Sequence, residues 1–494
     1  MDARRPSAQA VLIRAGRIAM VGDRAEIDAA AGDAPRLECE GRTLVPGFVD
    51  GHTHVELSCL SREHWVQAQT PPCRSLDDIG RRIRDREDSG DGWLVCRCSF
   101  ALQDKVVEQR LFTREELDDL VPDRPLAVLA GLHVAMLNTA ALRRLDLWDR
   151  EPPGVTLQRA ADGTPTGVAT EVWDLIPGLP RDAVMEAIAA HHRDLTLAQG
   201  ITSAHTIPFS AADAEACRLL QARGGLPLRL RTYCHVPRSA TLEALIESRA
   251  RPGAGDDWLR FGGVKIFVDG QHGDGLGRVF DDFKWTPGEL ARFVAQAHGA
   301  GLQLWMHAVS PGAVRMAARA VASATAGTPG RGRHRIEHGG DYLDVADIPL
   351  LRATGVRLVT TPHFLRSDTP VPGQSPLRTL IDAGFEPIGG TDTTGTVPEG
   401  AGPLFNIACA VNRTDAEGRV LDPDERIGVG EALRLFTAWA AAGAFEEDVK
   451  GRLAPGMLGD AVLVSEDVLS LPPERLFDVR VDATVVDGRV VYRR

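Results

Sequence analysis

The sequence lacks the features that mark membrane, disulfide-rich and disordered proteins. No apolar stretch is long enough to span a bilayer, and eight cysteines in 494 residues do not make a disulfide scaffold. Glycine (50 residues) and proline (31 residues) stay below the proportion typical of disordered chains. No tandem repeat or low-complexity segment is present. A folded globular protein remains, too long for one small domain and short for more than three.

An excess of basic residues is also missing. The net charge is −12 and the pI is about 5.7, whereas a nucleic-acid-binding protein needs a basic face. The polar first ten residues do not resemble a signal peptide. We therefore expect a cytoplasmic protein with reduced thiols, no nucleic-acid partner and no membrane partner. Assembly into a homo-oligomer stays open.

Lysine is scarce. Only four of the 56 basic residues are lysines, at positions 105, 265, 284 and 450, so arginine supplies most of the positive charge. Lys265 is unusual because it lies inside the apolar segment Gly263–Phe267. A lysine at that place in an arginine-biased chain needs a chemical reason.

The middle of the chain alternates short apolar runs with helical patterns. Alternating strands and helices favour βαβ units with a parallel sheet, and eight such runs predict a (β/α)₈ TIM barrel. The runs are Thr43–Val49, Gly200–His205, Leu226–His235, Gly262–Asp269, Gly301–His307, His334–His338, Val356–Thr361 and Glu386–Asp392. The helical patterns are Arg181–Gln199, Ala212–Arg223, Pro287–Ala300, Ala313–Ala324 and Asp344–Ala353.

Both ends of the chain are rich in predicted strands. Residues 8–22 alternate around a turn, and Asp487-Gly488 between two β-branched runs indicates a hairpin. We expect the fold class to be α/β: a TIM barrel (47–60 and 172–450), a small β-sandwich built from both termini (1–46 and 451–494), and an inserted α+β subdomain over the barrel mouth (61–171).

The strongest local motif is His52-Thr53-His54, which follows an apolar run. Side chains two residues apart on a strand point to the same side, and barrel enzymes place their sites at the carboxyl ends of the strands. Imidazole is the commonest metal ligand, although two polar residues at a strand end could also explain the motif.

Ligand-type residues follow other apolar runs as well. They are Lys265, His307, His338 and Asp392. One such histidine is usually a core residue, but this set in strand order indicates a metal site. Imidazole with carboxylate suits Zn²⁺, and also Fe²⁺, Co²⁺ or Mn²⁺.

The chain resembles the amidohydrolase superfamily over nearly its whole length, and within it the amidohydrolase-3 or YtcJ-like branch that includes N-substituted formamide deformylases. The matching motifs are Gly16–Gly22, Gly41–Asp50, Asp123–Pro125, His133 with Asn138–Leu142, Asp162–Gly167, Gly263–Ile266, Ile336–His338, and Ala454–Gly456 before Gly459–Ala461. The segment Asp269–Gly275, and the threonines on either side of Asp392, depart from the family pattern and leave the substrate open.

The resemblance implies six metal ligands: His52, His54, Lys265, His307, His338 and Asp392. It also implies one or two divalent ions, with Lys265 carboxylated on its amine and bridging them. A plain ammonium has no lone pair to give a metal, whereas a carbamate does. The alternative interpretation is a salt bridge between Lys265 and Asp269.

The predicted mechanism is hydrolysis by metal-activated water, with Asp392 as the catalytic base and acid. The predicted pocket wall consists of His133, Glu171, His205, His272 and His363, whereas Trp173 and Trp305 are expected to pack. We expect a C–N bond of a small amide or N-formyl compound to be cleaved. A metal-dependent lyase or isomerase on the same scaffold is the alternative, and a relative without catalysis is opposed by the complete ligand set.

Overall fold

In a computed structural model of the protein, the structure describes residues 7–86, 92–271, 282–326, 332–367, 371–393 and 398–494. Among these, eight parallel strands form one sheet whose order follows the chain. They are β4 (Phe48–Thr53), β11 (Ile201–Thr206), β12 (Arg229–His235), β13 (Leu259–Phe267), β16 (Leu304–His307), β17 (Arg335–Glu337), β18 (Arg357–Thr360) and β19 (Ile388–Gly389). The two edges meet where Asp392 N donates to His52 O at 2.9 Å. The predicted barrel is confirmed.

One predicted run corresponds to two strands. Residues 43–49 form β3 (Thr43–Pro46), which pairs with the C-terminal β20 (Ala461–Val464), and then the start of β4. Gly47 separates them, and a Cβ at that position would lie 2.3 Å from Thr202 Oγ1. The chain thus passes directly from the terminal sheet into the barrel.

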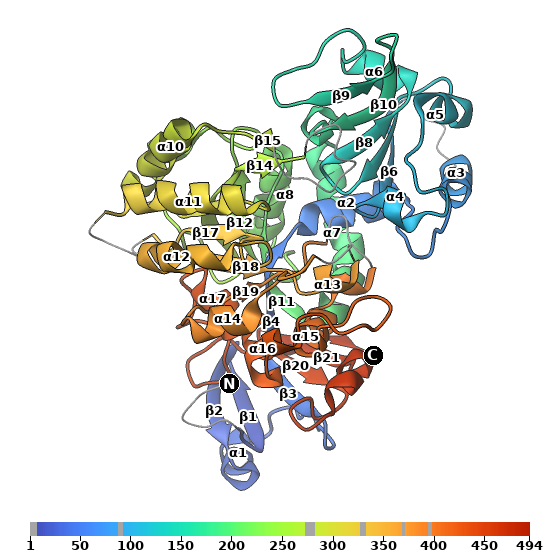
Figure 1. The fold of residues 1–494 in the computed structure, drawn as a ribbon. Coiled ribbons are helices and arrows are strands. Elements are labelled where there is room, and N and C mark those ends of the chain that lie inside the picture. Colours follow the sequence, from blue (N-terminus) through green and yellow to red (C-terminus); the bar gives the residue numbers. More distant parts are fainter. Residues whose placement is uncertain (1–6, 87–91, 272–281, 327–331, 368–370, 394–397) are drawn as a thin grey trace.

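Helices cover the outside of the barrel (Figure 1). They are α2 (Val55–His64), α7 (Arg181–Leu195), α8 (Ala211–Ala222), α9 (Leu242–Glu247), α10 (Pro287–Gly299), α11 (Pro311–Ala324), α12 (Ile348–Thr354), α13 (Phe364–Ser367), α14 (Leu377–Asp382), α15 (Pro403–Asn412), α16 (Val429–Leu435) and α17 (Ala438–Ala442). The helix predicted over 181–199 is interrupted at Thr196, where a short 3₁₀ turn follows. None of the described helices is long and apolar enough to cross a membrane.

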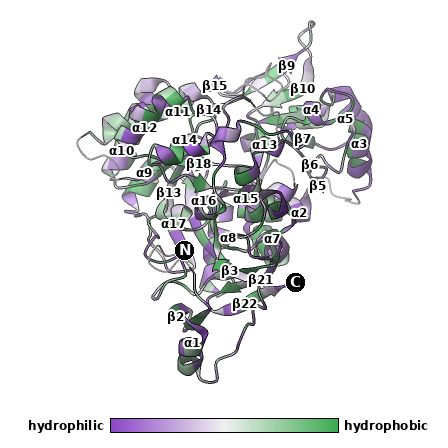
Figure 2. Ribbon diagram, turned by 60° about the horizontal axis from the view of Figure 1, so that its bottom comes forward, coloured by the Kyte–Doolittle hydropathy of each residue, from purple (hydrophilic) through white to green (hydrophobic). Residues whose placement is uncertain are grey.

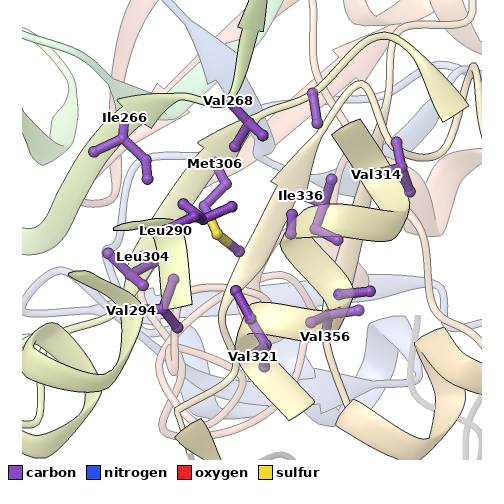
Figure 3. Packing of buried hydrophobic residues seen from close by; sticks show 14 of the residues in the cluster. Ile266, Val268, Leu290, Val294, Leu304, Met306, Val314, Val321, Ile336 and Val356 are labelled. Atoms are coloured by element: carbon purple, nitrogen blue, oxygen red, sulfur yellow. The ribbon is translucent and has the colours of Figure 1, made fainter. Parts of the chain in front are cut away.

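Alternation along the strands separates core from site. Ile266, Leu304 and Ile336 point outward and pack with Leu290 of α10 and Val314 of α11 (Figure 3). Each buried aliphatic side chain contributes about 1.5–3 kcal/mol. The intervening residues of the same strands point into the barrel. The helices that pack on these strands also carry both kinds of residue: Figure 2 shows hydrophilic and hydrophobic residues interspersed along α10, α11 and α12.

The insertion has its own sheet and core. Its six strands have the order β5 (Val66–Gln67), β6 (Leu94–Cys98), β7 (Leu126–Ala130), β8 (Val134–Leu137), β10 (Pro165–Thr170) and β9 (Thr156–Arg159). Helices α3 (Leu76–Arg84), α4 (Leu102–Lys105), α5 (Arg114–Leu120) and α6 (Thr139–Arg144) accompany them. Figure 1 shows this sheet at the upper right, beyond α2. The expected α+β insertion is confirmed.

The two chain ends share the opposite end of the molecule (Figure 1). A hairpin of β1 (Ala10–Arg14) and β2 (Arg17–Gly22) leads into α1 (Arg24–Ala31), a helix that the sequence analysis missed. β3 and β20 continue into β21 (Val481–Val486) and β22 (Arg489–Arg493) to give a four-stranded antiparallel sheet. The predicted sheet structure from both termini is confirmed.

Candidate metal centre

Side chains from the ends of two barrel strands, β4 and β17, converge on the carboxylate of Asp392, which follows a third strand, β19. His54 Nε2 lies 3.2 Å from Asp392 Oδ1, and His52 Nε2 lies 3.7 Å from the same oxygen. His338 Nε2 lies 3.9 Å from Oδ2. One ligand atom each from His52, His338 and Asp392 fall within 4.8 Å of one another. The HxH motif and the ends of β17 and β19 therefore form one cluster.

Two further predicted ligands lie beside this cluster. The ring of His307, at the end of β16, is centred 4.9 Å from that of His338. Lys265 on β13 is buried, and its Nζ lies 4.6 Å from the centre of the Phe267 ring. No ion pair joins Lys265 to Asp269 in the described structure, and Asp269 instead accepts hydrogen bonds from Val309 N and Ser310 N. The salt-bridge interpretation of Lys265 is wrong.

Burial keeps the imidazoles neutral. It lowers the pKa of His338 to about 3 and lowers those of His52, His54 and His307. Burial alone would raise the pKa of Asp392, but its hydrogen bond with His54 and its other histidine neighbours hold that pKa well below the usual range. Neutral imidazoles around a carboxylate offer lone pairs without repelling a cation.

The donor set fits a divalent ion. The Nε2 atoms of His52, His54 and His338 lie 3.2–3.9 Å from the carboxylate oxygens of Asp392 and all three rings are buried, so imidazole nitrogens and a carboxylate face one buried space. Nitrogen and oxygen donors in this number match Zn²⁺ and its first-row neighbours.

Asp392 is held in a strained backbone conformation. Its φ is +42°, and that of His338 is +63°. Such conformations cost about 1–3 kcal/mol and persist only where the surroundings enforce them. Here Asp50 accepts from Thr391 N at 3.0 Å and from Thr391 Oγ1 at 2.5 Å. His363 Nε2 donates to Thr391 O at 2.9 Å, so the structure places His363 behind Asp392.

His133 and Glu171 bring the insertion to the site. His133 Nδ1 donates to Glu171 Oε1 at 2.8 Å, and the His133 ring lies 5.2 Å from that of His307. Glu171 Oε1 also accepts from Gln271 N at 2.9 Å. Burial would raise the pKa of Glu171, but His133 and Lys284 lower it overall. The pair thus presents an imidazole to the metal cluster on a fixed carboxylate.

Two other predicted pocket residues have different outcomes. His205 points into the barrel, where its Nδ1 accepts from Arg335 Nη1 at 3.0 Å and its Nε2 lies 3.9 Å from Glu446 Oε2. Among the described residues, Arg335 thus satisfies Nδ1, whereas the buried Nε2 has no hydrogen-bond partner. His272 lies outside the described residues.

Aromatic side chains surround the ligands. Phe209 stacks on His54 with ring centres 4.9 Å apart, and Trp305 meets His52 edge-on at 4.9 Å. Trp173 packs against Phe209 and belongs to the same buried cluster. Trp173 and Trp305 thus pack within this buried cluster, which gives the ligands apolar surroundings.

Comparison with known proteins agrees with this geometry. The sequence pattern of the Amidohydrolase family matches residues 37–492. This chain belongs to the amidohydrolase family. It is therefore a hydrolase that acts on carbon–nitrogen bonds, and the resemblance found in the sequence is confirmed.

Relatives extend over the full chain. The amidohydrolase is 28% identical to the N-substituted formamide deformylase of Arthrobacter pascens, across 100% of this chain and 96% of that protein. It is 25% identical to the YtcJ protein of Bacillus subtilis, across 94% and 91%. Its fold is similar to that of an uncharacterized metal-dependent hydrolase from Pyrococcus horikoshii, with a TM-score of 0.71 at 22% identity, across 94% and 95% of the two chains.

Sequence reasoning about this amidohydrolase missed three residues next to the site. Glu337 contacts His52, Asp50 holds Thr391, and His235 ends β12 beside Lys265. His235 was detectable, because it is the last residue of a predicted strand run. Glu337 and Asp50 lie inside quoted motifs, but their partners, His52 and Thr391, are hundreds of residues away in the chain, so the spacing gives no signal of the contacts.

Proposed function

We propose that this amidohydrolase cleaves the C–N bond of a small amide or N-formyl compound at a divalent metal site. The observation that carries the proposal is the convergence of His52, His54 and His338 on Asp392 at the carboxyl ends of the barrel strands. Barrel enzymes perform their chemistry at this end.

His52, His54, His338 and Asp392 would hold the ion, with His307 and a carboxylated Lys265 completing one or two sites. Zn²⁺ suits this donor set best. When bound, a divalent ion supplies Lewis-acid chemistry, acidifying water and polarising a carbonyl. The deep burial of Lys265 supports its carboxylation, because a neutral amine reacts with CO₂ and burial lowers the pKa of Lys265 to about 8.

Asp392 is the residue that moves the proton. Its carboxylate stays ionised, lies at hydrogen-bonding distance from His54, and follows β19 at the carboxyl end of the barrel strands. It would accept a proton from the attacking water and return that proton to the leaving nitrogen. The hydrogen bonds that Asp50 and His363 make with Thr391 fix the neighbouring carboxylate of Asp392 during both proton transfers.

The surroundings favour an uncharged or weakly polar substrate. Phe209, Phe267 and Leu132 flank the ligands with apolar surface, and Leu132 comes from the inserted subdomain. His133 on Glu171 is the polar group placed to orient a substrate, with His272 as a second proposed contact. The formamide deformylase of A. pascens makes N-substituted formamides the first substrates to test.

Removal and return of metal test the proposal. We expect a chelator to abolish hydrolysis of an N-substituted formamide, and Zn²⁺, Mn²⁺ or Co²⁺ to restore it. Reaction in ¹⁸O-labelled water should place the label in the carboxylate product, with one amine released per carboxylate. Metal-dependent turnover without incorporation of label would instead support a lyase or isomerase.

His133 should affect substrate binding or turnover and leave metal binding unchanged. We expect His133→Ala to raise KM or lower kcat by about tenfold, because one orienting hydrogen bond to substrate is lost. Bound metal, measured by atomic emission, should equal that of the parent. His191→Ala serves as the control histidine, because His191 is half-buried and its ring pairs with Glu63. Loss of metal from His133→Ala would make His133 a ligand and contradict the six-ligand site.

A further inference from the structure

A buried carboxylate stands behind the ligand His52. Glu337 Oε2 lies 2.6 Å from His52 Nδ1, and both side chains are buried. A carboxylate can only accept, so Nδ1 carries the proton of the neutral imidazole. The lone pair then belongs to Nε2, which is the nitrogen that faces Asp392 at 3.7 Å. This contact selects the tautomer that a metal needs.

Glu337 is itself fixed by a two-point contact. Arg335 Nε donates to Oε1 and Arg335 Nη2 donates to Oε2, both at 2.9 Å, and neither residue is exposed to solvent. Fork-to-fork pairing sets direction as well as distance. Arg335 Nη2 also donates to Gly51 O at 2.6 Å, and the guanidinium lies 4.4 Å from the Trp305 ring centre. Glu337 therefore has little freedom to leave His52.

His205 completes the chain of contacts. Arg335 Nη1 has no lone pair, so the 3.0 Å contact requires His205 Nδ1 to accept. Burial and the neighbouring cations lower the pKa of His205 well below its ordinary value, which keeps that nitrogen available as an acceptor. All three guanidinium nitrogens of Arg335 thereby have defined acceptors.

We propose that Glu337, held by Arg335 and His205, is a positioning residue that sets the tautomer and ring orientation of His52. The inference rests on the proposed function in one respect, that His52 binds the metal. Strand β17 then serves the site twice: Glu337 supports a ligand on β4, and the next residue, His338, is a ligand itself. The predicted pocket residue His205 then has a role as well, because it holds Arg335 below the site.

Supporting carboxylates of this kind change metal affinity by about 10–100-fold. We expect Glu337→Gln to weaken Zn²⁺ binding by that factor in a competition titration with a chromogenic chelator. Asp460→Asn is the matched control, because Asp460 forms a buried two-point pair with Arg229 at 2.7 and 3.0 Å away from the metal cluster. Asp460→Asn should lower the unfolding midpoint and leave Zn²⁺ affinity within about twofold of the parent.

The metal-free parent protein supplies a second readout. In ¹⁵N-histidine NMR spectra, His52, assigned by its loss in His52→Ala, should carry its proton on Nδ1. Protonation on Nε2 would overturn the proposal even if Glu337→Gln fails to fold. Unchanged Zn²⁺ affinity in folded Glu337→Gln would overturn it as well. A parent that binds no metal would refute the proposed function, while the tautomer measurement would still decide the role of Glu337.

Discussion

Asp392→Asn should lower kcat/KM by about 10³–10⁴-fold while the chain still folds. The amide cannot take a proton from water at neutral pH, so the step assigned to Asp392 loses its base. The substitution is nearly isosteric and leaves the backbone contacts of Thr391 with Asp50 and His363 in place. The loss should therefore appear in turnover far more than in the unfolding midpoint. Steady-state kinetics with metal analysis on each preparation measure both.

Asp415→Asn is the control for this substitution. Asp415 is a buried carboxylate that accepts from Arg419 N at 2.8 Å, on a different segment of the chain. Asp415→Asn should lower the unfolding midpoint and leave kcat/KM unchanged. If Asp392→Asn retained more than about a tenth of the parental turnover at full metal occupancy, Asp392 would be a ligand without proton-transfer function, and His133 would become the candidate base.

The sequence predicts the barrel and its ligand residues for one shared reason. Along β13, β16 and β17 every second side chain points outward into the helix-facing core, as Ile266, Leu304 and Ile336 do. This alternation leaves an apolar periodicity that is visible in the sequence. Each ligand is the last residue of a strand or lies just after it, so it is placed at the barrel mouth. Local pattern and position along the strand together therefore locate His307, His338 and Asp392.

Other features depend on contacts that the sequence does not encode locally. His205 and His307 both end apolar runs, yet His205 faces Arg335 inside the barrel, whereas His307 lies beside His338. How far a side chain lies along the barrel axis follows from the stagger between neighbouring strands, and the sequence of a single strand does not contain that stagger. The division of residues 43–49 between two sheets follows from the close approach of Gly47 to Thr202. Spacing alone cannot reveal either.

Lys265 allows a prediction in which activity and stability change in opposite directions. We expect Lys265→Met to abolish hydrolysis and reduce bound metal, yet to stabilise the metal-free protein by up to about 3 kcal/mol at pH 7. Burial is the main cause that lowers the pKa of Lys265, from 10.5 to about 8, and nearby carboxylates offset it only partly. Each pKa unit of this difference corresponds to about 1.4 kcal/mol in the free energy of unfolding. Methionine fills similar space without a charge to desolvate.

The pH dependence follows from the sign of that shift. Because the pKa is lower in the folded state, the penalty is fully present below pH 8 and disappears as pH rises toward 10.5. Urea unfolding of the metal-free proteins at pH 7 and pH 9.5 should therefore show the advantage of Lys265→Met shrinking. Arg229→Met is the control of opposite sign: Arg229 forms a buried two-point pair with Asp460 at 2.7 and 3.0 Å, and its loss would leave that carboxylate buried without its cation at both pH values.

The same position separates a carboxylated lysine from a plain one. If the carbamate supplies a carboxylate to the metal, Lys265→Ala should regain part of its turnover when acetate or propionate is added, because a small acid can occupy the space of the missing side chain. Lys265→Met should not respond, since methionine fills that space. Equal response of both variants, or a bare amine in an atomic-resolution map of the metal-loaded parent, would contradict carboxylation. The buried amine would then have to act as a cation beside the metal, at the full desolvation cost that Lys265→Met removes.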